Sequence, residues 1–182
     1  MSSPSADVSC RVAWADGAPA ISRLQLRVRE QDLGALIPAD VLGTDPEAAE
    51  AAWREALNRP GDARVRVLVG LERNRVVGFV ITSPASDPDT DPVVDAELME
   101  LTVDPDERGK GHGSRLLQAA VDTMTADRFR RAVLWVVADD DAMRGFLSSA
   151  GWAPDTAHRE LDLDGTGTTT VKQVRLHTAI GP

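Results

Sequence analysis

The stretch LTVDPDERGKGHGSRLL, residues 101–117, runs from the end of an apolar strand pattern, through a loop with three glycines, into an amphipathic helix pattern. The N-terminus of a helix carries unpaired N–H groups and a partial positive charge, which together favour an anion. Gly109, Gly111 and Gly113 let the backbone adopt positive φ and leave no Cβ atom to keep a phosphate away. The stretch therefore predicts a strand, a phosphate-binding loop and a helix in succession.

The spacing of the glycines separates this loop from two better-known phosphate loops. A Walker loop requires GxxxxGK followed by Ser or Thr, and a dinucleotide-binding loop requires GxGxxG. The sequence instead contains RxxGxG, formed by Arg108, Gly111 and Gly113. Gly109 lies outside this spacing and is expected to be only permissive, whereas Arg108 and Lys110 supply positive charge. For such a loop taken alone, a plain flexible turn is the alternative.

The rest of the chain alternates strand and helix patterns around this stretch. Apolar residues recur at helical spacing in four segments, and they alternate or run together in the segments between these. The order β-α-α-β-β-β-α-β-α-β-β predicts an α/β (α+β) fold with a mixed sheet of about seven strands and helices on both faces. The sequence predicts strands over residues 11–15, 63–72, 76–83, 93–103 and 131–138, a final hairpin within 158–180, and helices over 18–33, 46–58, 113–127 and 139–151.

Length and composition limit the classes of function. A chain of 182 residues with 42% hydrophobic residues is expected to form a single domain over residues 9–182, after a disordered N-terminus at residues 1–8. Because no apolar run could span a membrane and the first residues lack a secretory signal pattern, no membrane partner and a cytoplasmic location are expected. The single cysteine, Cys10, excludes an internal disulfide and a thiolate zinc cluster, and three scattered histidines predict no metal site. The net charge of −9 argues against nucleic acid as a partner.

Two blocks of the sequence resemble the GNAT superfamily of N-acetyltransferases. The family signature Q/R-x-x-G-x-G/A matches the glycine loop, and VLWVVADDDAMRGFLSSAGW, residues 133–152, matches a later strand and a helix that ends in Gly-aromatic. With the hairpins around them, these blocks cover roughly residues 63–160. The resemblance implies the GNAT fold, in which the fourth and fifth strands splay apart, and acetyl-CoA as the acyl donor. The resemblance implies that the donor contacts Leu101, Thr102, Val103, Arg108, Gly109, Lys110, Gly111, His112, Gly113, Ser114, Asp140 and Phe146. For Asp140, capping of the following helix is the alternative to a contact with the donor.

The same resemblance implies the catalytic groups. Acetyl transfer to an amine needs a base for the ammonium proton and is helped by an acid that protonates the departing thiolate. Counted back from Arg108, Glu97 falls where several family members carry a general-base glutamate. Glu97 and Glu100 are expected on opposite faces of the strand unless a β-bulge intervenes, and Glu100 is the reserve because a bulge would exchange their roles. Leu147 stands where the family often has a tyrosine acid, so water, Ser148 or another residue has to serve, or the thiolate leaves unprotonated.

The acidic stretch from Val76 to Glu107 bears on the acceptor. It holds nine acidic residues and no Lys or Arg, which predicts a negative potential that favours a cationic amine; a solvated acidic loop is the alternative. Trp53 is expected to be a packing residue or to border the acceptor pocket. The function expected is acetyl-CoA-dependent transfer to a primary amine, of a small molecule or a peptide N-terminus, in a ternary complex. The alternative is a CoA-binding regulatory or interaction domain without transferase activity. Dimers are common in the family, so a homodimer is a candidate assembly.

Overall fold

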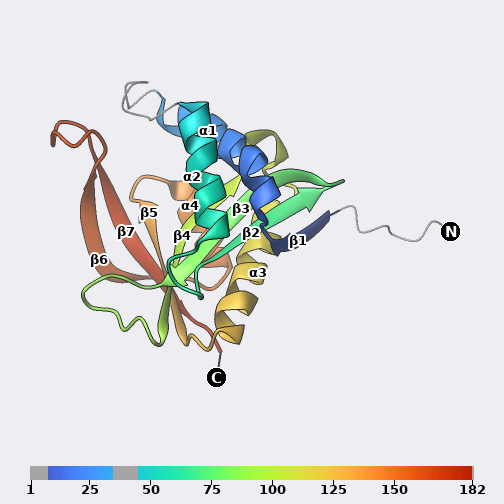
Figure 1. The fold of residues 1–182 in the computed structure, drawn as a ribbon. Coiled ribbons are helices and arrows are strands. Elements are labelled where there is room, and N and C mark those ends of the chain that lie inside the picture. Colours follow the sequence, from blue (N-terminus) through green and yellow to red (C-terminus); the bar gives the residue numbers. More distant parts are fainter. Residues whose placement is uncertain (1–7, 35–44, 182) are drawn as a thin grey trace.

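The computed structural model describes residues 8–34 and 45–181, and it contains the predicted order of elements around a seven-stranded sheet (Figure 1). Of the N-terminus expected to be disordered, residues 1–7 lie outside the described residues, and Val8 begins the first strand. No helix among the described residues has the length and apolar composition to cross a membrane. The elements are β1 (Val8–Val12), α1 (Ala18–Leu33), α2 (Pro46–Asn58), β2 (Arg66–Glu72), β3 (Arg75–Pro84), β4 (Asp95–Val103), α3 (His112–Ala126), β5 (Arg131–Val137), α4 (Asp141–Ser149), β6 (Ala153–Asp162) and β7 (Thr170–Ala179).

The N-termini of the helices differ in a way that matters for function. The Asp45 side chain accepts hydrogen bonds from two backbone N–H groups in the first turn of α2. Asp140 does the same for α4, where its side chain accepts from the N–H of Met143 at 2.9 Å. These aspartates satisfy N–H groups that a helix otherwise leaves unpaired. In α3 the capping position is Gly111, and no side chain caps that helix.

The sheet has the strand order β1-β2-β3-β4-β5-β7-β6. Neighbouring strands are antiparallel except β4 and β5, which run parallel and pair only over Asp95–Glu97 of β4. Beyond Glu97 the two strands diverge, which confirms the splay expected between the fourth and fifth strands. The predicted β1 was placed wrongly over residues 11–15. It lies at Val8–Val12 because pairing with β2, which sets Cys10 opposite Gly70, determines its position.

Two apolar clusters fix the helices on opposite faces of the sheet. Helices α1 and α2 lie side by side on one face, as Figure 1 shows, and pack on β2 and β3. Helices α3 and α4 pack on the other face over the centre of the sheet. The first cluster includes Ala18, Ile21, Leu24, Trp53, Val69, Leu71 and Phe79, and the second includes Leu116, Leu117, Ala120, Met124, Leu147, Leu98, Val80, Leu134 and Leu176.

Candidate active site

A cavity of about 620 Å³ opens where the end of β4, the glycine loop, α3 and α4 meet, and α1 forms its remaining wall. Most of the residues predicted to contact an acyl donor line it, whereas Lys110 and His112 do not. The predicted residues among its lining are Leu101, Thr102, Val103, Arg108, Gly109, Gly111, Gly113, Ser114, Asp140 and Phe146. The cavity therefore runs from the start of α3 to the part of β4 that has left β5.

The glycine loop presents an open helix N-terminus to this cavity. Gly109 and Gly111 have φ of 77° and 85°, in the left-handed region that favours glycine. Gly109 is thus more than permissive, because its backbone conformation itself favours glycine. A Cβ atom on Gly113 would lie 3.6 Å from Phe146 and 3.8 Å from Val103, which are ordinary contact distances. Since no side chain caps α3, the N–H groups of its first turn are available to an anion.

Of the side chains expected to add positive charge, only Arg108 faces the cavity. Its guanidinium donates to the Asp32 carboxylate of α1 at 3.0 Å and to the Val103 carbonyl oxygen at 3.3 Å. The Lys110 ammonium instead lies 2.6 Å from the Glu107 carboxylate. The His112 side chain is buried, so this residue can reach a ligand only through its backbone. Arg108 is therefore held in place at the cavity wall by α1.

A β-bulge at Met99 arranges the two candidate glutamates. Ile81 of β3 pairs with Glu100, but the next residue, Thr82, pairs with Leu98, which leaves Met99 without a partner. The sequence led us to expect the two glutamates on opposite faces, or with their roles exchanged by a bulge. The bulge instead places both on the face that α1 and α2 cover, because Met99 takes no partner on β3 and a single paired residue, Leu98, remains between them.

Glu97 lies half-buried beside the loop that joins β3 to β4. Burial raises the pKa of the Glu97 carboxyl, and the negative charge of Asp87 raises it further. The positive charge of Arg159 and hydrogen bonds from the backbone and side chain of Ser86 act in the opposite direction. A carboxylate with a raised pKa in a partly buried position is suited to accept a proton near neutral pH.

The Glu100 carboxylate accepts hydrogen bonds from two neighbouring side chains. One carboxylate oxygen accepts from the Gln25 amide at 2.7 Å, and the other accepts from the Thr102 hydroxyl at 3.0 Å. The Gln25 carbonyl in turn accepts from the Trp53 indole N–H at 2.9 Å. Trp53 also meets Phe79 edge to face, with ring centroids 5.3 Å apart. This chain of contacts ties α1 and α2 to β4, so Glu100 serves as an anchor, and Trp53 as the packing residue that the sequence suggested.

Leu147 occupies the position where the family often has a tyrosine acid. Leu147 is fully buried in α4 and packs in the core beside Trp152. Its neighbour Phe146 lines the cavity, whereas Ser148 is not among the lining residues. The described side chains thus offer no direct replacement for a tyrosine hydroxyl at this position.

The acidic stretch between residues 76 and 107 is largely neutralised. Arginine side chains from elsewhere in the fold, together with Lys110, pair with most of its carboxylates. These pairs reduce the negative potential on which the expectation of a cationic amine rested. The pairs are Arg175 with Asp87 and Asp89, Arg131 with Asp95, Arg27 with Asp104 and Asp106, Arg75 with Asp104 and Glu107, and Lys110 with Glu107.

One group of side chains has the composition of a metal site. Potential ligand atoms of Glu72, Glu107 and His112 lie within 4.8 Å of one another. However, Arg75 and Lys110 each lie 2.6 Å from the Glu107 carboxylate and already balance its charge. Glu107 therefore forms an ion-pair network with Arg75 and Lys110, and Nε2 of His112 lies 3.6 Å from the Glu72 carboxylate.

Sequence reasoning missed several residues of the site. Val28 and Asp32 of α1 and Ala142 and Met143 of α4 line the cavity. Asp32 had no local signal, because its partner Arg108 is 76 residues away in the chain. The apolar residues follow from helix periodicity only once the position of each helix over the sheet is known.

Comparisons with known proteins agree with this geometry. A model of the acetyltransferase (GNAT) family matches residues 22–152. The chain is 38% identical over 117 residues to mycothiol acetyltransferase of Streptomyces griseus, a match that covers 61% of this chain and 36% of that protein. The chain thus spans about a third of the length of this curated relative.

Solved structures share the fold over nearly the whole chain. Ribosomal-protein-alanine N-acetyltransferase from Brucella melitensis superposes with a TM-score of 0.73 at 22% identity, covering 94% of this chain and 99% of that one. The yncA protein from Salmonella typhimurium, solved with acetyl-CoA, gives a TM-score of 0.68 at 18% identity, covering 95% of this chain and 94% of that one. Identities this low show the fold alone, but the family model matches more than half of the chain. The chain belongs to the acetyltransferase (GNAT) family.

Proposed function

We propose that this chain transfers an acetyl group from acetyl-CoA to a primary amine by direct attack in a ternary complex. The observation that carries the proposal is the cavity that joins the uncapped N-terminus of α3 to the diverging end of β4. A donor with a pyrophosphate in its middle and a thioester at its end needs both features in one cavity. Membership of the family and the acetyl-CoA found with yncA support this choice of donor.

The phosphate end of the donor would be held by the chain itself. The N–H groups after Gly111 are without a capping side chain, and Gly109 and Gly111, which adopt positive φ, carry no Cβ atoms that could keep a phosphate away. Arg108, fixed by Asp32, adds a cation at the same wall. Leu101–Val103, where β4 no longer pairs with β5, would line the path of the pantetheine arm.

The reaction needs one proton acceptor from the protein. The free amine nitrogen attacks the thioester carbonyl carbon, the carbon–sulfur bond breaks, and the nitrogen gives up a second proton to water, so that an amide and the CoA thiolate result. We assign the acceptance of the ammonium proton to Glu97, because burial raises the pKa of its carboxyl and its face of β4 is the one opposite α3. Leu147 has no proton to give, so the thiolate is protonated by water or by another group, or departs unprotonated.

The acceptor belongs to the class of primary amines, of small molecules or of a peptide N-terminus. The paired carboxylates of the acidic stretch weaken the case for a polyamine, although Glu97 still offers one carboxylate to an ammonium group. We place the activity in the cytoplasm, as the sequence led us to expect, and a homodimer stays a prediction.

A second function is a CoA-binding domain without transfer activity, and the buried Leu147 at the acid position is the observation that favours it. Calorimetry with acetyl-CoA, followed by a thiol-release assay over a panel of primary amines, separates the two. Binding with amine-dependent CoA release supports the transferase, and binding without turnover of any amine supports the binding domain. Absence of binding at millimolar acetyl-CoA contradicts both.

Glu97→Gln tests the assignment of the base. We expect acetyl-CoA affinity close to wild type and a fall in the transfer rate of about 10²–10⁴-fold, the usual contribution of a positioned base. The loss is expected to be largest between the pKa of Glu97 and the higher pKa of the amine, where Glu97 is ionised and free amine is scarce. Wild-type turnover in this variant would assign the base to Glu100 or to bulk water.

A further inference from the structure

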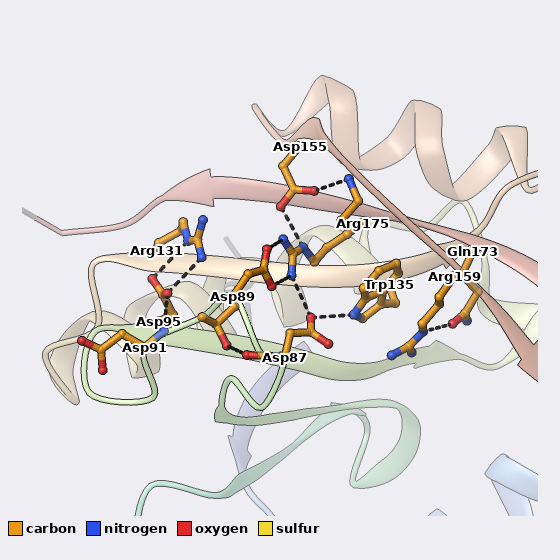
Figure 2. Close-up of polar contacts among 12 residues, drawn as sticks. Asp87, Asp89, Asp91, Asp95, Arg131, Trp135, Asp155, Arg159, Gln173 and Arg175 are labelled. Carbon is orange, nitrogen blue, oxygen red and sulfur yellow. Dashed lines mark hydrogen bonds and ion pairs between the residues drawn. The ribbon is translucent and has the colours of Figure 1, made fainter.

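The loop that joins β3 to β4, residues 85–94, is clamped to the far half of the sheet by one buried arginine (Figure 2). The side chain of Arg175 on β7 is only 4% exposed, and its three nitrogens donate to three different aspartates. Nε donates to Asp155 of β6 at 2.7 Å, and Nη1 donates to Asp87 at 3.0 Å and to Asp89 at 2.7 Å. A buried arginine with three carboxylate partners is costly to separate from them, so the loop is held firmly at this point.

Asp87 is the best fixed of the loop carboxylates. Its Oδ2 atom accepts from Arg175 and also from the indole N–H of Trp135 at 2.9 Å. Trp135 lies directly opposite Arg175 in the β5–β7 pair, so the sheet itself sets the distance between the two donors. Figure 2 shows the side chain of Asp87 between these two groups.

The clamp reaches the candidate base through the neighbour of Asp87. Ser86 lies beside the Glu97 carboxylate, where its backbone N–H and its hydroxyl lower the pKa of that carboxyl. Glu97 pairs with Val133 of β5, and Trp135 lies two residues further along that strand on the same face. Asp87, which Arg175 and Trp135 hold, therefore lies on the same face of the sheet as Glu97.

We propose that Arg175 is a positioning residue for acetyl transfer, because it fixes the loop so that Ser86 holds the Glu97 carboxylate and the charge of Asp87 stands beside it. The proposal rests on the function proposed above. It gives the acidic loop a role that neither a solvated surface nor a cationic-substrate funnel describes: the loop is a built part of the acceptor side of the site.

Several charged groups face Glu97 and bear on its titration. Asp87 comes from the loop, Arg159 from β6 with its guanidinium 4.2 Å from the Trp135 ring, and Glu100 from the same strand. His177 of β7 lies opposite Val133 in the β5–β7 pair. The negative charge of Asp87 disfavours ionised Glu97, so its removal lowers the pH at which Glu97 loses its proton.

Asp87→Asn tests the proposal with little change of shape. An asparagine carbonyl oxygen can still accept from Arg175 and Trp135, but the charge is gone. Asp89→Asn is the matched control, because it removes a charge from the same arginine without a contact to Trp135. A ¹³C NMR titration of the Glu97 carboxyl reads the effect without any substrate.

We expect Asp87→Asn to move the Glu97 titration to lower pH, by more than Asp89→Asn moves it. The acid limb of kcat/KM for an amine that is turned over is expected to move in the same direction. Equal titrations in the two variants would overturn the proposal, whether or not an amine substrate exists. If the Glu97 titration moves as expected but no amine is acetylated, the proposed function fails and the clamp on Glu97 stands.

Ser86→Ala and Arg175→Lys test the path from the arginine. Ser86→Ala removes the hydroxyl donor to Glu97, so its Glu97 titration is expected to move to higher pH with the fold unchanged. Lysine keeps the charge of Arg175 but not the fork that reaches three carboxylates. We expect Arg175→Lys to lower kcat with acetyl-CoA affinity unchanged; a folded Arg175→Lys variant with wild-type kcat and pH profile would show that the clamp is structural only.

Discussion

Gly78→Ala is expected to destabilise the fold and to disturb the cavity, whereas Gly70→Ala is not. The two glycines lie directly opposite each other on β3 and β2, under Leu116 of α3. A Cβ atom on Gly78 would lie 2.7 Å from the Thr102 carbonyl oxygen and 2.8 Å from a Leu116 methyl, whereas on Gly70 it would lie 3.4 Å from Leu116. The first distance involves backbone of β4, which cannot turn away as a side chain can.

The magnitude follows from these distances. Overpacking of this kind costs about 1–3 kcal/mol, and the loss of unfolded-state freedom from glycine to alanine offsets roughly 0.4–1 kcal/mol of it. For a domain of this size, each kcal/mol lowers the melting temperature by about 2–4 °C. We expect Gly78→Ala to melt several degrees below wild type and Gly70→Ala to stay close to it.

Urea unfolding followed by tryptophan fluorescence measures the free energy of unfolding of both variants, and an unchanged slope shows that the unfolded states are comparable. Because Thr102 and Val103 line the cavity, Gly78→Ala is also expected to bind acetyl-CoA more weakly than Gly70→Ala. Equal stability of the two variants would refute the reasoning, since it would mean that β3 and β4 separate at no cost.

Three further predictions address the loop, the α1–α2 wall and the response to acid. Gly111→Asp is expected to bind acetyl-CoA about tenfold or more weakly than Gly111→Asn. The two new side chains have the same shape and occupy the same position, where φ is 85°, but aspartate adds a negative charge beside the phosphates. Equal affinities in calorimetry would place the phosphates elsewhere. Trp53→Phe leaves the buried Gln25 carbonyl without its donor and is expected to lower the free energy of unfolding by about 1–3 kcal/mol; a loss below about 0.5 kcal/mol in chemical denaturation would mean that another donor replaces the indole. Glu107, whose pKa the Lys110 and Arg75 side chains lower to about 2, contributes stability that is present above its ordinary pKa of 4.5 and is lost as the pH falls toward 2; Glu107→Gln is expected to flatten unfolding stability over that range, and an unchanged slope would contradict the role of these ion pairs.

The parts of the fold that were predictable depend on neighbours in the sequence. Helices α1 and α2 begin and end where the sequence placed them, since proline, aspartate and helical spacing act within a few residues. The glycine loop was visible for the same reason. The position of β1 was not, because an edge strand takes its register from a partner strand, here β2, some 60 residues later.

In the candidate site, too, the predictable part depends on neighbours in the sequence and the rest on distant segments. The cavity wall formed by residues 101–114 follows from one contiguous motif. The partners that determine the roles of Glu97 and Glu100 come from distant segments: Gln25 lies 75 residues from Glu100, and Arg175 lies 88 residues from Asp87. A single sequence gives no sign of such pairs, so the acidic stretch was expected to carry a negative potential or to be a solvated loop.

The β-bulge at Met99 means that the faces of β4 cannot be assigned by counting alternate residues through this point. The Met99 side chain is 58% exposed, and the residues on either side of it pair with consecutive residues of β3. A relative that lacks the residue at Met99 would therefore keep both glutamates on the same face, whereas a relative of equal length without the bulge would place them on opposite sides of the sheet. An ungapped alignment of two such relatives would equate residues that never meet the same substrate, so transfer of catalytic roles between relatives has to begin by locating the bulge.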